Sequence, residues 1–172
     1  MSGPRIALTA GLITLAVVLQ TSVLDSFAWR GIVPDLALLV VVGVALVRGG
    51  EFGMVTGFAA GLVLDLAPPA DHLAGRWALA LLVVGYVAGR VRQDARPGAA
   101  PTATTVMATV AACSFVGSSI FALTGVVLRD PAVGIGELLQ AIAISLVWDL
   151  LLAPLVLPGV MAAFRRLEPT TR

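Results

Sequence analysis

The sequence predicts an all-α, polytopic membrane protein with six transmembrane helices in a single integral membrane domain over residues 1–172. Two observations support this prediction. Hydrophobic residues make up 59% of the 172 residues and charged residues only 12%, about half the charged share of a typical soluble domain. The apolar residues also fall into long runs separated by short polar turns, which leaves little length for a separate soluble module.

Six apolar runs are the expected helices. A spanning helix needs about 20 residues, and the second, third and fourth runs are short by that measure. Arginines at their ends, including Arg48 and Arg76, can reach the interface and lengthen them. The runs cover residues 6–24, 32–47, 52–66, 77–91, 104–128 and 138–164.

The first run is expected to remain in the protein as a helix and not to be cleaved as a signal peptide. It has 19 residues, whereas the apolar part of a signal peptide usually has about 7–15. The second and third runs are joined by a tight turn at 48–51, so they should be antiparallel neighbours. In the last run, Pro154 and Pro158 should bend the helix.

The arginines predict the orientation, because arginine accumulates on the cytoplasmic side of membrane proteins. Of the 11 basic residues, all arginine, eight lie at the termini, in the 48–51 turn or around the 92–103 loop. We therefore expect both termini in the cytoplasm. The 92–103 loop is then a cytoplasmic connection between two three-helix halves, 1–91 and 104–166. The eight residues are Arg5, Arg48, Arg90, Arg92, Arg96, Arg165, Arg166 and Arg172.

The third run carries the most informative motif, a ladder of glycines that ends in an acid. Gly53, Gly57 and Gly61 stand four residues apart, and Asp65 follows at the same spacing. Every fourth residue falls on one side of a helix. In a membrane, glycine at such positions lets a neighbouring backbone come close. The ladder therefore predicts a close contact between helices.

Small residues recur at the same spacing in later runs. Gly85 and Gly89 make a GxxxG pattern in the fourth run, and Ser114, Ser118 and Ala122 form a row in the fifth. Such rows more often pack within a chain than against another protein. The five glycines are thus candidate packing residues, and the sequence leaves open whether the neighbouring helix belongs to this chain or to a partner.

Three acids lie within or at the ends of apolar runs, where a carboxylate is energetically costly. Pro34-Asp35 is a good helix start, with the acid near the positive end of the helix dipole. Asp65 ends its run, where it opposes the dipole, and is expected to be an anchor at the external interface. Asp149 lies deep in the last run and needs a hydroxyl, another partner or protonation. With the predicted orientation, all three lie toward the external face.

Residues for catalysis or cofactor binding are scarce. The single His72 and the single Cys113 do not make a metal-ligand set, and no cofactor is expected. Ser118 and Ser119, with His72 as base, would make an intramembrane serine protease, but His72 belongs to a loop and not to the depth of the serines. A net charge of +1 gives no electrostatic case for binding nucleic acid.

Residues 34–89 resemble the MreD family, the rod shape-determining membrane proteins of bacteria. This part is about a third of the chain, and the remainder is similar in hydropathy and length only. No catalytic residue comes with the resemblance. The segments that carry it are Pro34-Asp35-Leu36, the glycine ladder into Leu64-Asp65-Leu66, the 68–75 loop, and Gly85-Tyr86 with Gly89. The positions that match the recurrent family residues are Pro34, Asp35, Gly57, Gly61, Asp65, Gly85 and Gly89.

The resemblance implies a fold, a location and a set of partners. The fold would be similar to the substrate-binding components of energy-coupling-factor vitamin transporters. The location would be the bacterial plasma membrane, within the machinery that elongates the cell wall. Its partners would be a single-span MreC-like protein, actin-like MreB, the glycosyltransferase RodA and a class B penicillin-binding protein. Because the external loops are short, these partners would be bound mainly through membrane helices.

Two functions are compatible with the sequence and with the family resemblance. The leading one is a non-enzymatic scaffold of peptidoglycan synthesis and cell shape that positions the single transmembrane helix of an MreC-like partner. The alternative is a subunit that binds a vitamin or another small molecule for a transporter. The same implied fold and the acids near the outer face motivate this alternative, although few external aromatic or amide side chains are present to hold a ligand.

Overall fold

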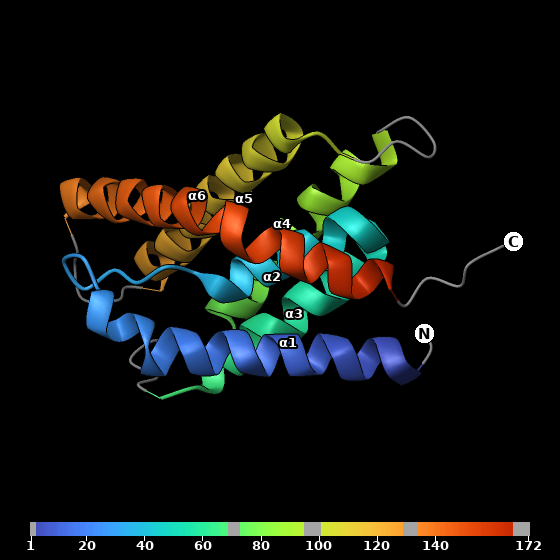
Figure 1. Cartoon of the computed structure of the whole chain (residues 1–172). Helices are drawn as coiled ribbons and strands as arrows, with labels where there is room; N and C mark the ends of the chain where they lie inside the picture. The colour runs from blue at the N-terminus through green and yellow to red at the C-terminus, as the bar shows by residue number, and fades with distance from the viewer. Residues whose placement is uncertain (1–2, 69–72, 95–100, 129–133, 167–172) are drawn as a thin grey trace, which may run out of the picture.

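The computed structural model describes residues 3–68, 73–94, 101–128 and 134–166. Within these residues the chain forms six α-helices, one short 3-10 helix and no strand (Figure 1). Each expected run coincides with one α-helix, which confirms the all-α prediction. The elements are α1 (Gly3–Ser22), η1 (Leu24–Phe27), α2 (Leu36–Arg48), α3 (Gly50–Leu66), α4 (Arg76–Asp94), α5 (Ala103–Val127) and α6 (Ile135–Arg165).

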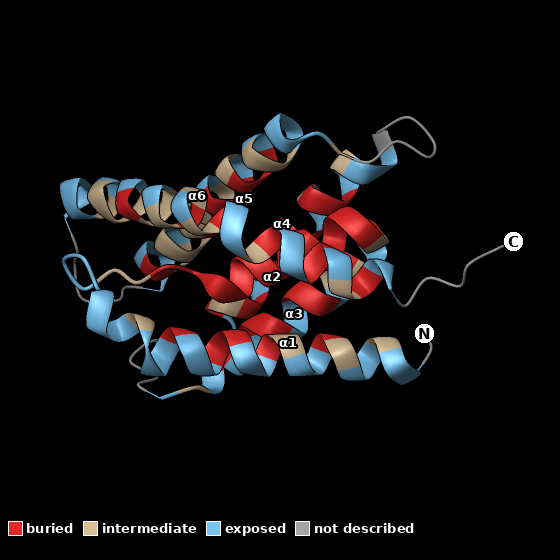
Figure 2. Ribbon diagram, viewed as in Figure 1, coloured by how far each residue is buried: buried red, intermediate tan, exposed pale blue. Residues whose placement is uncertain are grey.

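α2 lies at the centre of the bundle and contacts each of the other five α-helices. All of its residues from Leu36 to Val47 are buried (Figure 2). A helix that is apolar all round belongs inside a core. With 13 residues, α2 is about 20 Å long. Its run can be short because the other helices of the chain, and not lipid, surround it.

Three helices, α1, α5 and α6, are long and apolar enough to cross a membrane. Less than a third of each of their most apolar windows is buried inside the protein, so their apolar side chains mostly face outward. α2 and α3 are shorter, with 13 and 17 residues, and α4 carries arginines at both ends. Length and composition thus identify three of the six predicted spans directly.

Backbone turns with positive φ set the paths between helices. Gly49 has a φ of 89° and ends α2 one residue before α3 begins, and these two helices pack side by side as expected. Arg30 and Gly31, with φ of 53° and 79°, form a tight turn whose flanking residues exchange two backbone hydrogen bonds. Because of this turn, α2 begins at Leu36 and not at residue 32.

α6 continues through Pro154 and Pro158 as one helix of 31 residues. Figure 1 shows that it changes direction partway along its length, as expected where prolines remove backbone hydrogen bonds. Beyond the first proline, Leu157 and Val160 pack closely on Gly43 of α2. The bend therefore lets a long helix follow the central one.

Candidate functional site

The glycine ladder of α3 lies directly against α4. A Cβ atom added at Gly57 would lie 2.6 Å from the carbonyl carbon of Leu81, and one added at Gly61 would collide with the backbone of Trp77 and Ala78. Backbone atoms cannot rotate away as the end of a side chain can. The glycines therefore let the two helix backbones touch.

Glycines of both helices, α3 and α4, extend this contact along its length. Gly53 and Gly85 face each other, and a Cβ atom on either one would collide with the backbone of the other. Gly89 lies against Gly50 at the start of α3 in the same way. We call the packing of Gly53, Gly57 and Gly61 against α4, with Gly85 and Gly89, the glycine contact. Because α4 covers this face of α3, another protein's helix would reach it only by displacing α4.

Asp65, at the end of α3, caps the beginning of α4. Its Oδ2 accepts hydrogen bonds from the backbone N–H groups of Gly75 and Ala78, at 2.8 and 3.1 Å. Its Oδ1 accepts one from the N–H of Trp77, at 3.1 Å. The first N–H groups of a helix have no partner within it and form the positive end of its dipole. The carboxylate that opposes the dipole of α3 thus favours the dipole of α4.

The expectation that Asp65 is an anchor at the external interface stays a prediction, and the structure adds that its carboxylate is buried against the start of α4. Its side chain is only 2% exposed. The sequence showed an acid at the C-terminal end of one helix, but it did not show that the next helix begins against the same carboxylate.

Arg76, the first residue of α4, attaches that helix to α5. Its guanidinium carbon lies 4.1 Å from the ring centroid of Phe121, and its Nη2 donates a hydrogen bond of 2.9 Å to the Phe121 carbonyl oxygen. Trp77 stacks on the same ring with centroids 4.4 Å apart. Gly125, one turn further along α5, has no side chain and so leaves room for the guanidinium. The N-terminus of α4 is therefore held from α3 by Asp65 and from α5 by Phe121.

Asp149 of α6 performs the corresponding role at the beginning of α2. Its Oδ1 accepts a hydrogen bond of 3.0 Å from the backbone N–H of Asp35, and its Oδ2 accepts one of 2.6 Å from the hydroxyl of Ser114 in α5. The side chain of Asp149 is 1% exposed. We expected this acid to require a hydroxyl or another partner, and the structure provides a hydroxyl and a backbone amide.

Two more side chains satisfy amides in the first turn of α2. Asp35 accepts from the N–H of Leu38 at 2.9 Å, as its position at a helix start predicts. Gln20 of α1 accepts from the N–H of Ala37 through its Oε1, at 3.3 Å. A helix that starts inside an apolar core needs such internal acceptors because no water reaches its amides. We call Gln20, Asp35, Ser114 and Asp149 the α2 cap; it joins α1, α2, α5 and α6.

Three of the residues that hold the starts of α2 and α4 were not predicted from the sequence. Gln20 and Arg76 were not singled out as site residues, and Ser114 was assigned only to a row of small packing residues. Gln20 had a detectable signal, since it is the only amide side chain in the run 6–24. Ser114 had none, because its role depends on Asp149 of a helix far along the chain.

The structure describes only some of the residues considered for catalysis. The described residues contain no group of three or more His, Cys, Asp or Glu side chains placed to hold a metal ion. Cys113 is buried, with its Sγ 3.8 Å from the carbonyl oxygen of Val84. His72, the base in the protease alternative, lies outside the described residues, and Ser118 and Ser119 are partly buried in α5. The buried carboxylates instead cap helices.

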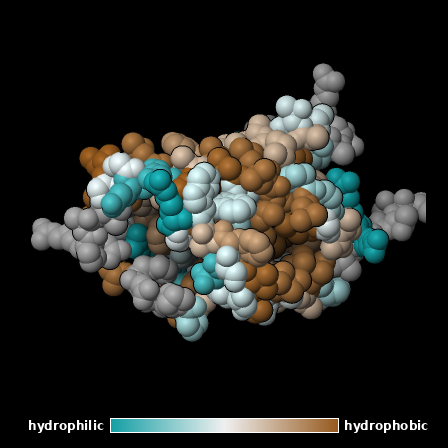
Figure 3. All heavy atoms as spheres, turned by 60° about the vertical axis from the view of Figure 1, so that its left-hand side comes forward, coloured by the Kyte–Doolittle hydropathy of each residue, from teal (hydrophilic) through white to brown (hydrophobic). Residues whose placement is uncertain are grey.

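Large apolar side chains cover the outside of the bundle. Leu15 on α1, Val55 on α3 and Leu155 on α6 are 55%, 55% and 77% exposed. Figure 3 shows a broad hydrophobic area across one face of the molecule, with hydrophilic residues gathered toward its ends. Exposed apolar surface of this extent marks contact with lipid or with other proteins.

Comparison with known protein families accounts for most of the chain. Residues 5–157 match the family of the rod shape-determining protein MreD, a range that includes both the glycine contact and the α2 cap. The chain belongs to the MreD family. It matches no curated protein and no solved structure.

Membership in the MreD family confirms the resemblance found in residues 34–89 and extends it over a much longer range. MreD proteins determine rod shape, are associated with the MreC and MreB shape machinery, and are not a known enzyme family. Together with three apolar helices long enough to span a bilayer, the family makes this chain a membrane protein involved in cell shape.

Proposed function

We propose that this MreD-family chain is a non-enzymatic scaffold of the machinery that builds the elongating cell wall. It lies in the bacterial plasma membrane as a multi-pass protein with six spans and with both termini in the cytoplasm. It binds the single transmembrane helix of an MreC-like partner, and through that partner it works with MreB, RodA and a class B penicillin-binding protein.

The observation that carries this proposal is the family match over residues 5–157. The exposed apolar faces of α1, α3 and α6 support it, because they offer helix surface that no other part of the described chain covers. The polar groups support it as well. The α2 cap and Asp65 use their carboxylates on backbone amides, which holds helices in place.

The glycine contact restricts where the partner helix binds. Since α4 occupies the glycine face of α3, the partner helix lies on an outer face of the bundle. Substituting leucine at Gly57 or Gly61 would force α3 and α4 apart, so such variants would test folding and not binding.

The proposal is tested by recovery of the chain with an affinity-tagged MreC-like partner from detergent extracts. Tryptophan is placed at one exposed position on each of three outer helices, as Leu15→Trp, Val55→Trp or Leu155→Trp. We expect a substitution on the binding face to lower recovery severalfold while the unfolding temperature of the chain stays unchanged. If all three variants, and a partner with an unrelated transmembrane helix, are recovered as well as wild type, binding through membrane helices is wrong.

The alternative, a small-molecule subunit of a transporter, rests on the implied similarity to the energy-coupling-factor components. It predicts a vitamin-sized ligand that co-purifies in a one-to-one ratio and uptake that depends on this chain. Mass spectrometry of the denatured, purified protein distinguishes the two functions, since the scaffold carries no such ligand.

A further inference from the structure

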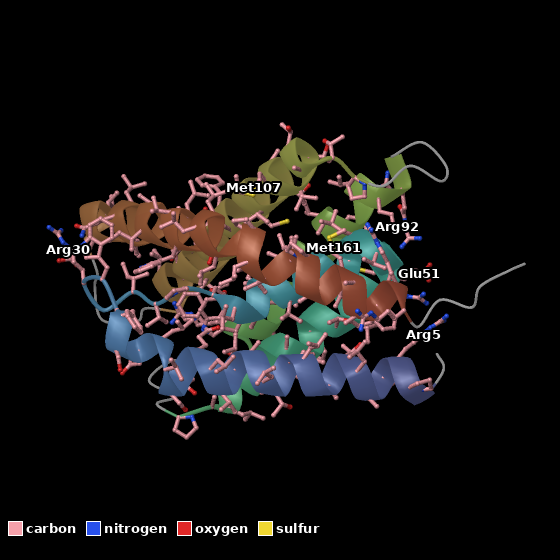
Figure 4. The ribbon with its side chains drawn as sticks, in the orientation of Figure 1. Arg5, Arg30, Glu51, Arg92, Met107 and Met161 are labelled. Carbon is pink, nitrogen blue, oxygen red and sulfur yellow. The ribbon has the colours of Figure 1, made fainter. Side chains whose placement is uncertain are left out.

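Among the described residues, four of the five exposed arginines lie at one end of the bundle, and the half-buried Arg5 lies there too. α1 begins there with Arg5, α4 ends there with Arg90 and Arg92, and α6 ends there with Arg165 and Arg166. Figure 4 shows Arg5 and Arg92 at this end and Arg30 at the opposite one. We call these five arginines at the shared end the arginine collar.

The charge of the arginine collar is not neutralised within the described residues, where none of the five takes part in an ion pair. Glu51 is the only exposed acid at this end among the side chains described there, and Figure 4 labels it near Arg92 and Arg5. The opposite end has charges of both signs: Asp25 lies in η1, Glu137 in the first turn of α6, and Arg30 in the turn before α2. The collar therefore has an excess of positive charge that the rest of the described chain does not balance.

The helix dipole explains only part of the arginine collar. Arg92 and Arg165 lie in the last turns of their helices, where a cation is favourable. Arg5 lies in the first turn of α1, where the dipole is positive and a cation is unfavourable. The dipole of α1 therefore does not favour Arg5, and an external anion beside it would offset that repulsion.

Apolar side chains lie directly beside the charged ones. Ile6, next to Arg5, is 48% exposed, and Tyr86, one helical turn from Arg90, is 44% exposed. Farther along α6, ten residues before Arg165, Leu155 is 77% exposed. A free anion would use the guanidinium groups alone, whereas a lipid would use both surfaces, its phosphate on arginine and its acyl chains on the apolar helix faces.

We propose that the arginine collar binds anionic phospholipids of the adjoining leaflet, with the phosphates on the guanidinium groups and the acyl chains along α1 and α6. Arginine suits this role because its planar guanidinium binds phosphate through two parallel hydrogen bonds. A basic residue close to an anionic membrane surface strengthens binding by about fivefold. Bound lipid would fix how deep the bundle sits in the membrane at this end.

The test uses the purified full chain in nanodiscs of phosphatidylcholine with an increasing fraction of phosphatidylglycerol. After mild extraction, native mass spectrometry counts the lipids that each protein molecule retains. The test variant combines Arg5→Gln, Arg165→Gln and Arg166→Gln, and Arg166→Gln alone is included in case the triple variant does not fold. Arg30→Gln at the opposite end is the matched control, since it removes the same charge outside the collar.

We expect wild type to retain phosphatidylglycerol in preference to phosphatidylcholine, Arg166→Gln to weaken that preference about fivefold, and the triple variant to abolish it. Arg30→Gln should behave as wild type. Equal retention of the two lipids by wild type, or equal losses in Arg30→Gln and Arg166→Gln, would overturn the proposal. Displacement of the lipid by inorganic phosphate would also overturn it, because the site would then recognise phosphate without the acyl chains. No partner protein is present, so failure of the scaffold proposal leaves this outcome unaffected.

Discussion

Asp149 offers the sharpest test of how the bundle is held together. Its carboxylate accepts one hydrogen bond from the Asp35 amide and one from the Ser114 hydroxyl, at 3.0 and 2.6 Å, in a site where only 1% of the residue is exposed. Asp149→Leu keeps the branched shape and the number of side-chain heavy atoms but leaves both donors without an acceptor. Asp149→Asn keeps an acceptor for the amide, and its NH₂ group can donate to the Ser114 oxygen.

The expected change in the free energy of unfolding follows from these two hydrogen bonds. A buried donor left without a partner costs about 1–3 kcal/mol, so Asp149→Leu should lower the free energy of unfolding by about 2–5 kcal/mol, after a small gain from removing a buried carboxylate. Asp149→Asn should lower it by less than about 1 kcal/mol, near the average worth of a hydrogen bond between membrane helices.

The assay is reversible unfolding of the purified chain in mixed micelles, followed by circular dichroism as a denaturing detergent is added. Leu151→Ala, at a 62% exposed position on the same helix, is the matched control and should change the unfolding free energy little. A double-mutant cycle with Ser114→Ala isolates the hydroxyl contact. If Asp149→Leu is as stable as Asp149→Asn, the carboxylate does not hold α2, and our interpretation of the α2 cap is wrong.

Three further predictions concern the contacts of α3, α4 and α5. Gly57→Ala should lower the unfolding free energy by about 1–3 kcal/mol or more, because the new Cβ would collide with the backbone of α4. The control in the same titration is Gly11→Ala, where a Cβ would meet nothing within 4 Å. This control variant should be as stable as wild type or slightly more stable. Asp65→Ala removes the acceptor of three amides and should cost about 1–2 kcal/mol by the same assay; a fully stable variant would mean that the cap contributes nothing. Phe121→Leu loses the ring beneath Arg76 and the stack on Trp77 and should cost about 1–2 kcal/mol, with a change in tryptophan fluorescence that an unaltered spectrum would contradict.

The helices themselves were predictable from the sequence because hydropathy is a local property. Every apolar run became a helix, and the turn at 48–51 and the prolines of the last run acted as expected. The largest shift is the start of α2, which the Arg30-Gly31 turn and the cap residue Asp35 place at Leu36, four residues later than the apolar run suggests. The preference of Asp35 for the position before a helix decided where α2 begins, and the hydropathy of the preceding residues did not.

The partners of the buried polar residues were not predictable, because each partner comes from a distant part of the chain. Asp149 and Ser114 are 35 residues apart, and Asp149 and Asp35 are 114 apart. No spacing rule connects such positions. The cap that Asp65 makes on α4 was not predicted for a related reason, since the helix-dipole argument considered only α3 and not the next helix.

For the glycine ladder, the sequence predicted the kind of contact but not the helix that makes it. Its spacing predicts a close helix contact, which the structure places between α3 and α4. Spacing does not tell which helix makes that contact, because any backbone that approaches closely satisfies the glycines equally. The sequence left open whether that helix belongs to this chain or to a partner, and the structure shows that it is α4 of this chain.

The most direct test of the scaffold proposal is photo-crosslinking in living cells. A photoreactive residue is placed at Leu15, Val55 or Leu155, each exposed on an outer helix face. We predict that at least one position crosslinks to the transmembrane helix of the MreC-like partner in cells that keep their rod shape. The absence of a crosslink at every outer face, while the partner still co-purifies with the chain, would contradict the proposal.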